Sequence, residues 1–345
     1  MKTSLFLASG ALFIASFQSL VVSDKTSSIA EPQMQKVLDA LTGLEGKPIE
    51  ELSPSEARRQ PTSVDAISKI RQDAGKNFLP NDKIIVRETS IPGPISQIPT
   101  FIYTPPGKGP FPVLVYYHGG GFVLADTKSY DASIRALVKG AKAIVVSVDY
   151  HQAPEHKFPA APNDAFAAYK WVLKHAKEFN GDPKRVAVAG ESAGGNLATV
   201  VALMARDNKI KMPLHQLLIY PVVSNNVNSP SYEDNANAKP LNKDMMKWFF
   251  KHYDGDPKNP YAVPMNAASL RGLPSTSIIA AEIDPLLSEG KGYADRLKED
   301  GVKVSYKKYP GVTHEFFGMG SVVPAAKDAQ IFASENLKMA FAQAK

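Results

Sequence analysis

Short apolar runs alternate with longer amphipathic stretches along most of the chain. Apolar runs predict strands at 83–88, 98–103, 113–117, 143–148, 185–189, 217–223, 276–283 and 302–309. Apolar residues at helical spacing predict helices at 130–138, 161–175, 194–206, 290–300 and 325–342. Strands that alternate with helices form parallel sheets with helical crossovers, and continuous apolar runs are typical of strands buried on both faces. The pattern predicts an α/β protein.

Two segments do not follow this alternation. Residues 31–78 have the spacing of amphipathic helices, and Ser53-Pro54-Ser55-Glu56 has the form of a helix start. Residues 225–264 are polar and rich in asparagine before an aromatic cluster that includes Trp248 and Phe249. We expect the two segments to form a helical cap over the sheet. The predicted cap segments are 24–80 and 225–264, and the catalytic domain is expected at 81–224 and 265–345.

The first residues resemble an export signal. A lysine at position 2 precedes a short apolar stretch at 5–17, which predicts a signal peptide over residues 1–23. The protein is then expected to be secreted or periplasmic, with no membrane span in the mature chain. The alternative is a hydrophobic helix that is not cleaved, which would leave the protein cytoplasmic or docked on a membrane.

Charge and cysteine content limit the kinds of partner and catalytic site that the chain can have. The chain of 345 residues is 44% hydrophobic, and its 40 basic and 34 acidic residues give a net charge of +6. The basic residues are scattered singly, so the pattern does not favour nucleic acid as a partner. The absence of cysteine excludes disulfides, thiolate metal sites and a cysteine nucleophile. Catalytic chemistry must come from other side chains.

A candidate nucleophile lies between a predicted strand and a predicted helix. Ser192 is the centre of Gly190-Glu191-Ser192-Ala193-Gly194. Glycines two residues on either side allow a strained strand-to-helix turn that exposes the serine hydroxyl, and the helix N-terminus adds positive potential. The pentapeptide alone is weak evidence, but this location favours a catalytic serine.

A base and an acid follow in the order that this kind of serine requires. Asp284 comes directly after the predicted strand 276–283, and His314 follows the predicted strand 302–309. A serine hydroxyl needs a base, and the base needs a group that fixes its tautomer. The order Ser, Asp, His, with each residue beyond the carboxyl end of a strand, predicts a triad of Ser192, Asp284 and His314.

A glycine loop supplies candidate oxyanion donors. His118-Gly119-Gly120-Gly121-Phe122 leaves the predicted strand 113–117. Consecutive glycines let backbone amides approach a substrate carbonyl, so we expect Gly120, Gly121 and Ala193 to hold the oxyanion. His118 is interpreted as a support for this loop and not as the base. The substrate pocket is expected to be lined by Phe122, Tyr220, Trp248 and Phe249.

Together with Asp149-Tyr150, Ala153-Pro154-Glu155 and Tyr309-Pro310-Gly311, these motifs resemble the hormone-sensitive-lipase family of α/β-hydrolases, mostly bacterial carboxylesterases. The resemblance implies an eight-stranded, mostly parallel sheet with helices on both faces, a helical cap, no metal or cofactor, and an acyl-enzyme on Ser192. It also implies a possible homodimer through the last strand. Two positions depart from the family pattern: His151-Gln152 replaces the usual Arg-Leu, and Glu191 replaces an aspartate.

The sequence therefore predicts a carboxylesterase that hydrolyses small esters with short acyl chains. An amidase or a deacetylase of a specific small molecule would use the same triad. A non-catalytic receptor on the same fold is a further alternative, although such receptors typically lack the triad histidine.

Overall fold

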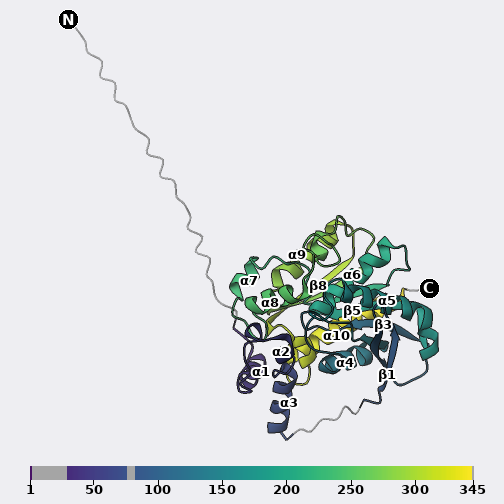
Figure 1. The fold of residues 1–345 in the computed structure, drawn as a ribbon, viewed down its shortest axis with the longest axis horizontal. Coiled ribbons are helices and arrows are strands. Elements are labelled where there is room, and N and C mark those ends of the chain that lie inside the picture. The colour runs from purple at the N-terminus through teal and green to yellow at the C-terminus, as the bar shows by residue number, and fades with distance from the viewer. Residues whose placement is uncertain (2–28, 76–81, 344–345) are drawn as a thin grey trace.

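One eight-stranded sheet forms the centre of the molecule (Figure 1). The computed structural model describes Met1 and residues 29–75 and 82–343, so the predicted signal peptide lies outside the described residues apart from Met1. The strand order is β1-β2-β4-β3-β5-β6-β7-β8. β2 is antiparallel to both of its neighbours, and the remaining pairs are parallel. The predicted fold class is confirmed.

The strands lie close to their predicted positions. They are β1 (Ile85–Pro92), β2 (Gln97–Thr104), β3 (Phe111–Tyr117), β4 (Ile144–Val148), β5 (Gly181–Glu191), β6 (His215–Ile219), β7 (Ser275–Ile283) and β8 (Val304–Thr313). The prediction for 217–223 was wrong at its end. The chain leaves the sheet after Ile219 because Tyr220 adopts a positive φ of 35°.

Helices cover both faces of the sheet. The longer ones are α1 (Pro32–Thr42), α3 (Ser63–Asp73), α4 (Asp131–Ala141), α5 (Ala160–His175), α6 (Ala193–Asp207), α8 (Lys243–Tyr253), α9 (Leu287–Glu299) and α10 (Pro324–Ala342). Shorter ones are α2 (Pro54–Ala57), α7 (Pro230–Asp234) and five 3-10 turns, η1 (Ile49–Glu51), η2 (Lys128–Tyr130), η3 (Ala176–Phe179), η4 (Pro264–Asn266) and η5 (Phe316–Met319).

Alternate residues of the central strands enter different cores. On β3, Val113, Val115 and Tyr117 pack in the core with α5, α6 and α9. Leu114 and Tyr116 pack on the other side with α4 and α10. Because both faces are buried, the strands are apolar throughout, which explains the continuous runs in the sequence.

The helices of the two predicted cap segments come from distant parts of the chain. In Figure 1, α1, α2 and α3 lie together at one end of the molecule, on the side where α7 and α8 also lie. A third apolar cluster joins the two cap segments, with Leu52 from the first segment and Trp248 and Phe249 from α8. The indole Nε1 of Trp248 donates to the carbonyl of Leu52 at 3.0 Å. The predicted start of α2 is confirmed, since Ser53 and Glu56 form a capping box.

Arg58 connects the first predicted cap segment to residues that follow β3 and β4. Its guanidinium donates to the carbonyls of Val123 and Ala153, both at 2.9 Å. The same group forms two hydrogen bonds of 2.7 Å with the carboxylate of Glu155. Val123 follows the glycine loop directly, so this one side chain holds the first predicted cap segment beside the loop.

We predict that Arg58→Ala lowers the free energy of unfolding by about 2 kcal/mol, because hydrogen bonds to a charged group are lost and two carbonyls lose their donor. The exposed ion pair with Glu155 contributes at most about 1 kcal/mol of this. Urea unfolding measures the change. Arg59→Ala is the matched control, because Arg59 is the exposed neighbour of the same residue type, and it is expected to change stability by less than about 0.5 kcal/mol. Equal effects of the two substitutions would contradict the prediction.

Candidate active site

Ser192 occupies a strained turn between β5 and α6. Its backbone has φ 57° and ψ −118°, a conformation that is costly for any residue with a side chain. A Cβ atom at Gly194 would lie 1.9 Å from the carbonyl oxygen of Tyr117, and one at Gly190 would lie 2.1 Å from the carbonyl oxygen of Gly194. The two flanking glycines are therefore required by close backbone contacts.

Backbone hydrogen bonds hold this turn against the neighbouring strand. The amide of Ser192 donates to the carbonyl of Ile219 at 2.9 Å, at the end of β6. The carbonyl of Ser192 accepts from the amides of Asn196 and Val222, both at 3.1 Å. Bonds on both sides of the residue maintain the strained conformation.

His314 and Asp284 form a buried pair beside this turn. Asp284 follows β7 directly, His314 follows β8 directly, and both side chains are buried. Nδ1 of His314 lies 2.7 Å from Oδ2 of Asp284, and the amide of Leu286 donates to Oδ1 at 2.9 Å. Because an ionised carboxylate only accepts hydrogen bonds, Nδ1 carries the proton and Nε2 is left with its lone pair.

The surroundings of His314 change its acidity. Burial disfavours the imidazolium, but the charge of Asp284 and its hydrogen bond favour it, as do the nearby carboxyl groups of Glu315 and Glu191. Together these effects raise the pKa of His314 above its ordinary value. The ring is therefore a stronger base than a histidine in water.

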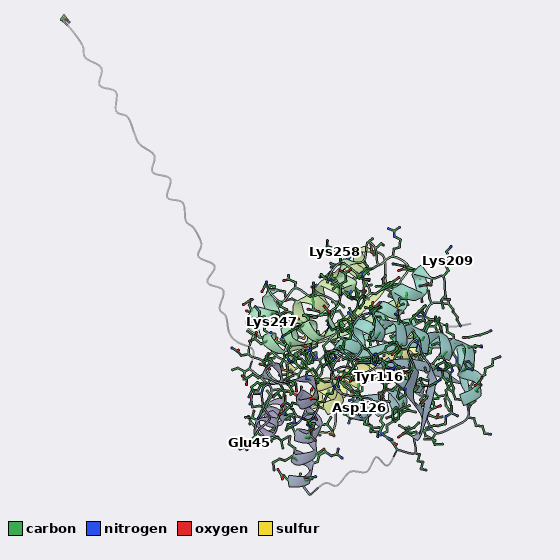
Figure 2. All side chains as sticks on the ribbon, viewed as in Figure 1. Glu45, Tyr116, Asp126, Lys209, Lys247 and Lys258 are labelled. Carbon is green, nitrogen blue, oxygen red and sulfur yellow. The ribbon has the colours of Figure 1, made fainter. Side chains whose placement is uncertain are left out.

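Glu191 connects the serine turn to the histidine through Tyr220. The hydroxyl of Tyr116 donates to Oε1 of Glu191 at 2.5 Å, and the hydroxyl of Tyr220 donates to Oε2. Burial raises the pKa of the Glu191 carboxyl despite these two hydrogen bonds. The ring of Tyr220 packs on His314 with centroids 4.5 Å apart. Figure 2 shows Tyr116 in the interior, away from the labelled lysines at the periphery.

Close contacts determine the conformation of the glycine loop. Gly120 and Gly121 both have positive φ, 97° and 60°. A Cβ atom at Gly120 would lie 2.1 Å from the carbonyl oxygen of Leu124, and one at Gly121 would lie 2.1 Å from the ring of Phe249. One at Gly119 would lie 2.3 Å from the hydroxyl of Tyr130. None of the three positions accommodates a side chain.

Three backbone amides at this edge of the sheet have no acceptor. Within residues 29–75 and 82–343, no hydrogen bond is formed by the N–H groups of Gly120, Gly121 or Ala193. Because no other described residue occupies them, these three N–H groups are free to donate to a ligand beside Ser192. They are the three residues expected to hold the oxyanion.

His118 lies within the loop and not beside the serine. Its Nδ1 is 2.8 Å from the carbonyl oxygen of Gly119, and its ring stacks on Tyr150 with centroids 4.4 Å apart. Nε2 lies 3.9 Å from the carboxylate of Asp149. Burial lowers the pKa of His118, so the ring is neutral near neutral pH. These contacts agree with a supporting position.

The four predicted pocket residues are all buried. Phe122 stacks on Tyr253 with centroids 3.8 Å apart, and Phe249 covers Gly121. Trp248 is directed toward the first cap segment by its bond to Leu52. Tyr220 lies behind His314, and its contact with substrate remains a prediction, as does that of the other three.

A cavity of about 140 Å³ lies between α3, α4 and η5. Its walls include Glu191 and Glu315, the neighbours of Ser192 and His314 in sequence, but not the serine or the histidine themselves.

Among the described residues, no hydrogen bond joins the Ser192 hydroxyl to His314. Such bonds often tighten only when substrate is bound. In the same part of the chain, no group of three His, Asp or Glu side chains is placed to hold a metal ion.

Sequence reasoning missed the tyrosines that bond Glu191. Tyr116 is 75 positions from Glu191 and lies within an apolar strand, where alternation predicts only a core residue. The sequence marks Glu191 as a departure from the family pattern, but its partners depend on the neighbouring strands β3 and β6. Only the strand order could have indicated them.

No helix in the described parts of the chain has the length and apolar character needed to span a membrane.

Comparison with known proteins identifies the family. A family model described as "alpha/beta hydrolase fold" matches residues 114–318. Among curated proteins, carboxylesterase NlhH of Mycobacterium tuberculosis is 41% identical over 259 residues, which are 73% of this chain and 81% of the relative. Ethyl acetate hydrolase of Pseudomonas putida is 32% identical over 298 residues, 84% and 92% of the two chains.

Solved structures of esterases also match this chain over most of its length. A thermostable esterase from Pseudomonas putida matches with a TM-score of 0.82 and 38% identity, covering 90% of this chain and 98% of the other. An esterase from the archaeon Pyrobaculum calidifontis matches with a TM-score of 0.80 and 36% identity, covering 91% and 99%. The chain belongs to the hormone-sensitive-lipase-like family of α/β-hydrolases.

Proposed function

We propose that this protein is a serine carboxylesterase that hydrolyses small esters with short acyl chains. The observation that carries the proposal is the buried bond of 2.7 Å between His314 and Asp284 at the edge of the sheet where Ser192 and three unpaired amides lie. Relatives named carboxylesterase, esterase and ethyl acetate hydrolase support ester hydrolysis.

The reaction proceeds through an acyl-enzyme. Ser192 Oγ attacks the ester carbonyl carbon while Nε2 of His314 takes the hydroxyl proton. Asp284 holds the imidazole in the reactive tautomer and stabilises the imidazolium. The amides of Gly120, Gly121 and Ala193 bind the oxyanion, and each donor contributes about 3 kcal/mol in the transition state. His314 then gives its proton to the leaving alcohol, and water hydrolyses the acyl-Ser192 ester by the same steps.

The preference for short chains is inferred from the aromatic residues of the cap. Phe249 contacts Gly121, and Phe122 is stacked on Tyr253, so large rings occupy the space directly beside the proposed oxyanion donors. A long acyl chain would have to displace these packed rings. A short acyl group requires less space.

Two further features belong to the proposal. Residues 1–23 act as a signal peptide and direct export, which the mass of the processed protein after expression in a secreting host would test. A homodimer forms through β8, which is the edge strand of the sheet; the amide of Glu31 occupies the carbonyl of Gly311 near its end, and a second copy would pair with the rest of the edge. Light scattering would give the oligomeric state.

The first test compares steady-state hydrolysis of p-nitrophenyl acetate, butyrate, octanoate and palmitate. Acetate and butyrate are expected to turn over fastest, and Ser192→Ala is expected to reduce kcat by about 10⁶-fold because the nucleophile is lost. Circular dichroism of the variant controls for folding. A folded wild-type protein that is inert toward every ester would support the receptor alternative, and activity on palmitate alone would refute the preference for short chains.

We predict that kcat/KM rises with pH as His314 loses its proton, with a midpoint above about pH 6.5, the ordinary histidine value. The midpoint is displaced upward because Asp284 raises the pKa of the ring. Asp284→Asn removes that charge, so the midpoint should move to lower pH while the plateau falls by about 10⁴-fold through loss of the correct tautomer. An unchanged midpoint in the variant would show that Asp284 does not control the base.

Gly121→Ala is expected to lower kcat by about 10²- to 10³-fold, the usual effect of losing one oxyanion donor. The added methyl group would meet the ring of Phe249 and an unfavourable φ of 60°, and the amide would be displaced. Gly301→Ala is the matched control, since φ there is also positive, at 80°, and no atom lies within 4 Å. Control and variant with the same kcat would contradict the assigned role of Gly121.

A further inference from the structure

A second serine, histidine and aspartate form a connected chain outside the site described above. Oγ of Ser96 lies 2.7 Å from Nε2 of His151. Nδ1 of the same ring lies 2.5 Å from Oδ2 of Asp164. These three residues share no member with Ser192, His314 and Asp284. Their atoms follow the order hydroxyl, Nε2, Nδ1 and carboxylate, the order that the proposed mechanism gives to Ser192, His314 and Asp284.

The burial of the three groups is graded from the protein interior to the surface. Asp164 lies in the second turn of α5 and is completely buried, and among the described residues its Oδ1 has no hydrogen-bond partner. The side chain of His151 is 15% exposed. Ser96 is exposed in the turn between β1 and β2, next to Ile95, which is 52% exposed. The serine is accessible to a reagent, while the carboxylate is not.

Hydrogen bonding fixes the direction of proton transfer. Oδ2 of Asp164 also accepts from the backbone amide of His151 at 2.9 Å. The same carboxylate oxygen therefore bonds both the backbone and the ring of the histidine. Because a carboxylate only accepts, Nδ1 of His151 carries the proton and Nε2 accepts the hydroxyl hydrogen of Ser96. The alternative acceptor for that hydrogen, the carbonyl of Gln97, is farther away at 3.4 Å.

The turn that carries Ser96 has a defined conformation. The amide of Gly93 donates to the carbonyl of Ser96 at 3.0 Å. A Cβ atom at Gly93 would lie 2.5 Å from that same carbonyl oxygen, so only glycine fits there. This turn keeps the hydroxyl of Ser96 within reach of His151.

We propose that Ser96 is a second nucleophile, activated by His151 and Asp164, which accepts acyl groups from activated esters such as aryl esters. Ser96 Oγ attacks the acyl carbon, its proton passes to Nε2 of His151, and the phenolate leaves and is protonated by the imidazolium. The products are acyl-Ser96 and a phenol, and His151 is neutral again. No glycine loop comparable to residues 119–121 adjoins Ser96 in the described chain, so turnover is slow and the acyl group accumulates.

The experiment uses Ser192→Ala, which removes the main site. The full chain is incubated with p-nitrophenyl acetate, quenched in acid, digested and analysed by mass spectrometry for acetylated serines. Ser90 is the internal control, because it is also exposed, on the adjacent strand β1. Acetylation of Ser96 is expected to be at least about 100-fold faster than that of Ser90, the lower limit of what a positioned general base contributes.

His151→Arg in the Ser192→Ala background separates base catalysis from simple exposure. An arginine can still donate two hydrogen bonds to Asp164, but it has no lone pair that could take a proton. Acetylation of Ser96 should then fall to the rate at Ser90, with an unchanged urea midpoint as evidence of folding. Equal rates at Ser96 and Ser90 before this substitution, or a rate at Ser96 that survives it, would overturn the proposal.

Discussion

The strained conformation of Ser192 is the constraint on which the arrangement of the site depends. Its φ of 57° is maintained by backbone hydrogen bonds on both sides of the residue, and close backbone contacts leave room only for glycine at positions 190 and 194. Strain of this kind amounts to about 1–3 kcal/mol, and it persists only when the surrounding structure enforces it. Here the enforcement comes from β3, β5, β6 and α6 together. Because the glycine loop begins at the same end of β3, the constraint that positions the serine also positions the proposed oxyanion donors.

Much of the fold can be predicted from the sequence, because the central strands are buried on both faces and therefore form continuous apolar runs. Each proposed catalytic residue follows a strand directly, so the strand ends, the flanking glycines and the order Ser, Asp, His together predict Ser192, Asp284 and His314 at one edge of the sheet. The end of β6 was placed too far because Tyr220 continues the apolar run while its backbone turns away. The bonds of Tyr116 and Tyr220 to Glu191, and the contact of Phe249 with Gly121, depend on which side chains meet in space. The periodicity of apolar residues carries no information about contacts between side chains that are distant in the sequence.

The two sets of serine, histidine and aspartate differ both in geometry and in surroundings. Ser96 is hydrogen-bonded to His151, whereas among the described residues no bond joins Ser192 to His314. His314 is buried beside Asp284, next to unpaired amides, whereas His151 is partly exposed and serves a serine on a surface turn. Proton transfer from a hydroxyl requires only the three aligned groups. Stabilising the oxyanion requires donors fixed in advance by the fold, and the proposed donors belong to the glycine loop and the start of α6. The comparison separates what a triad does alone from what the hydrolase fold adds to it.

The packing of Phe249 on Gly121 links the size of the substrate pocket to the order of the glycine loop. Phe249 belongs to α8 in the cap, whereas Gly121 belongs to the loop that follows β3. Any repacking of α8 that makes room for bulkier esters also removes the neighbour that restrains this glycine. Broader substrate scope would therefore come with a less ordered arrangement of the proposed oxyanion donors. Engineering or natural drift toward larger substrates should need compensating changes in the loop itself.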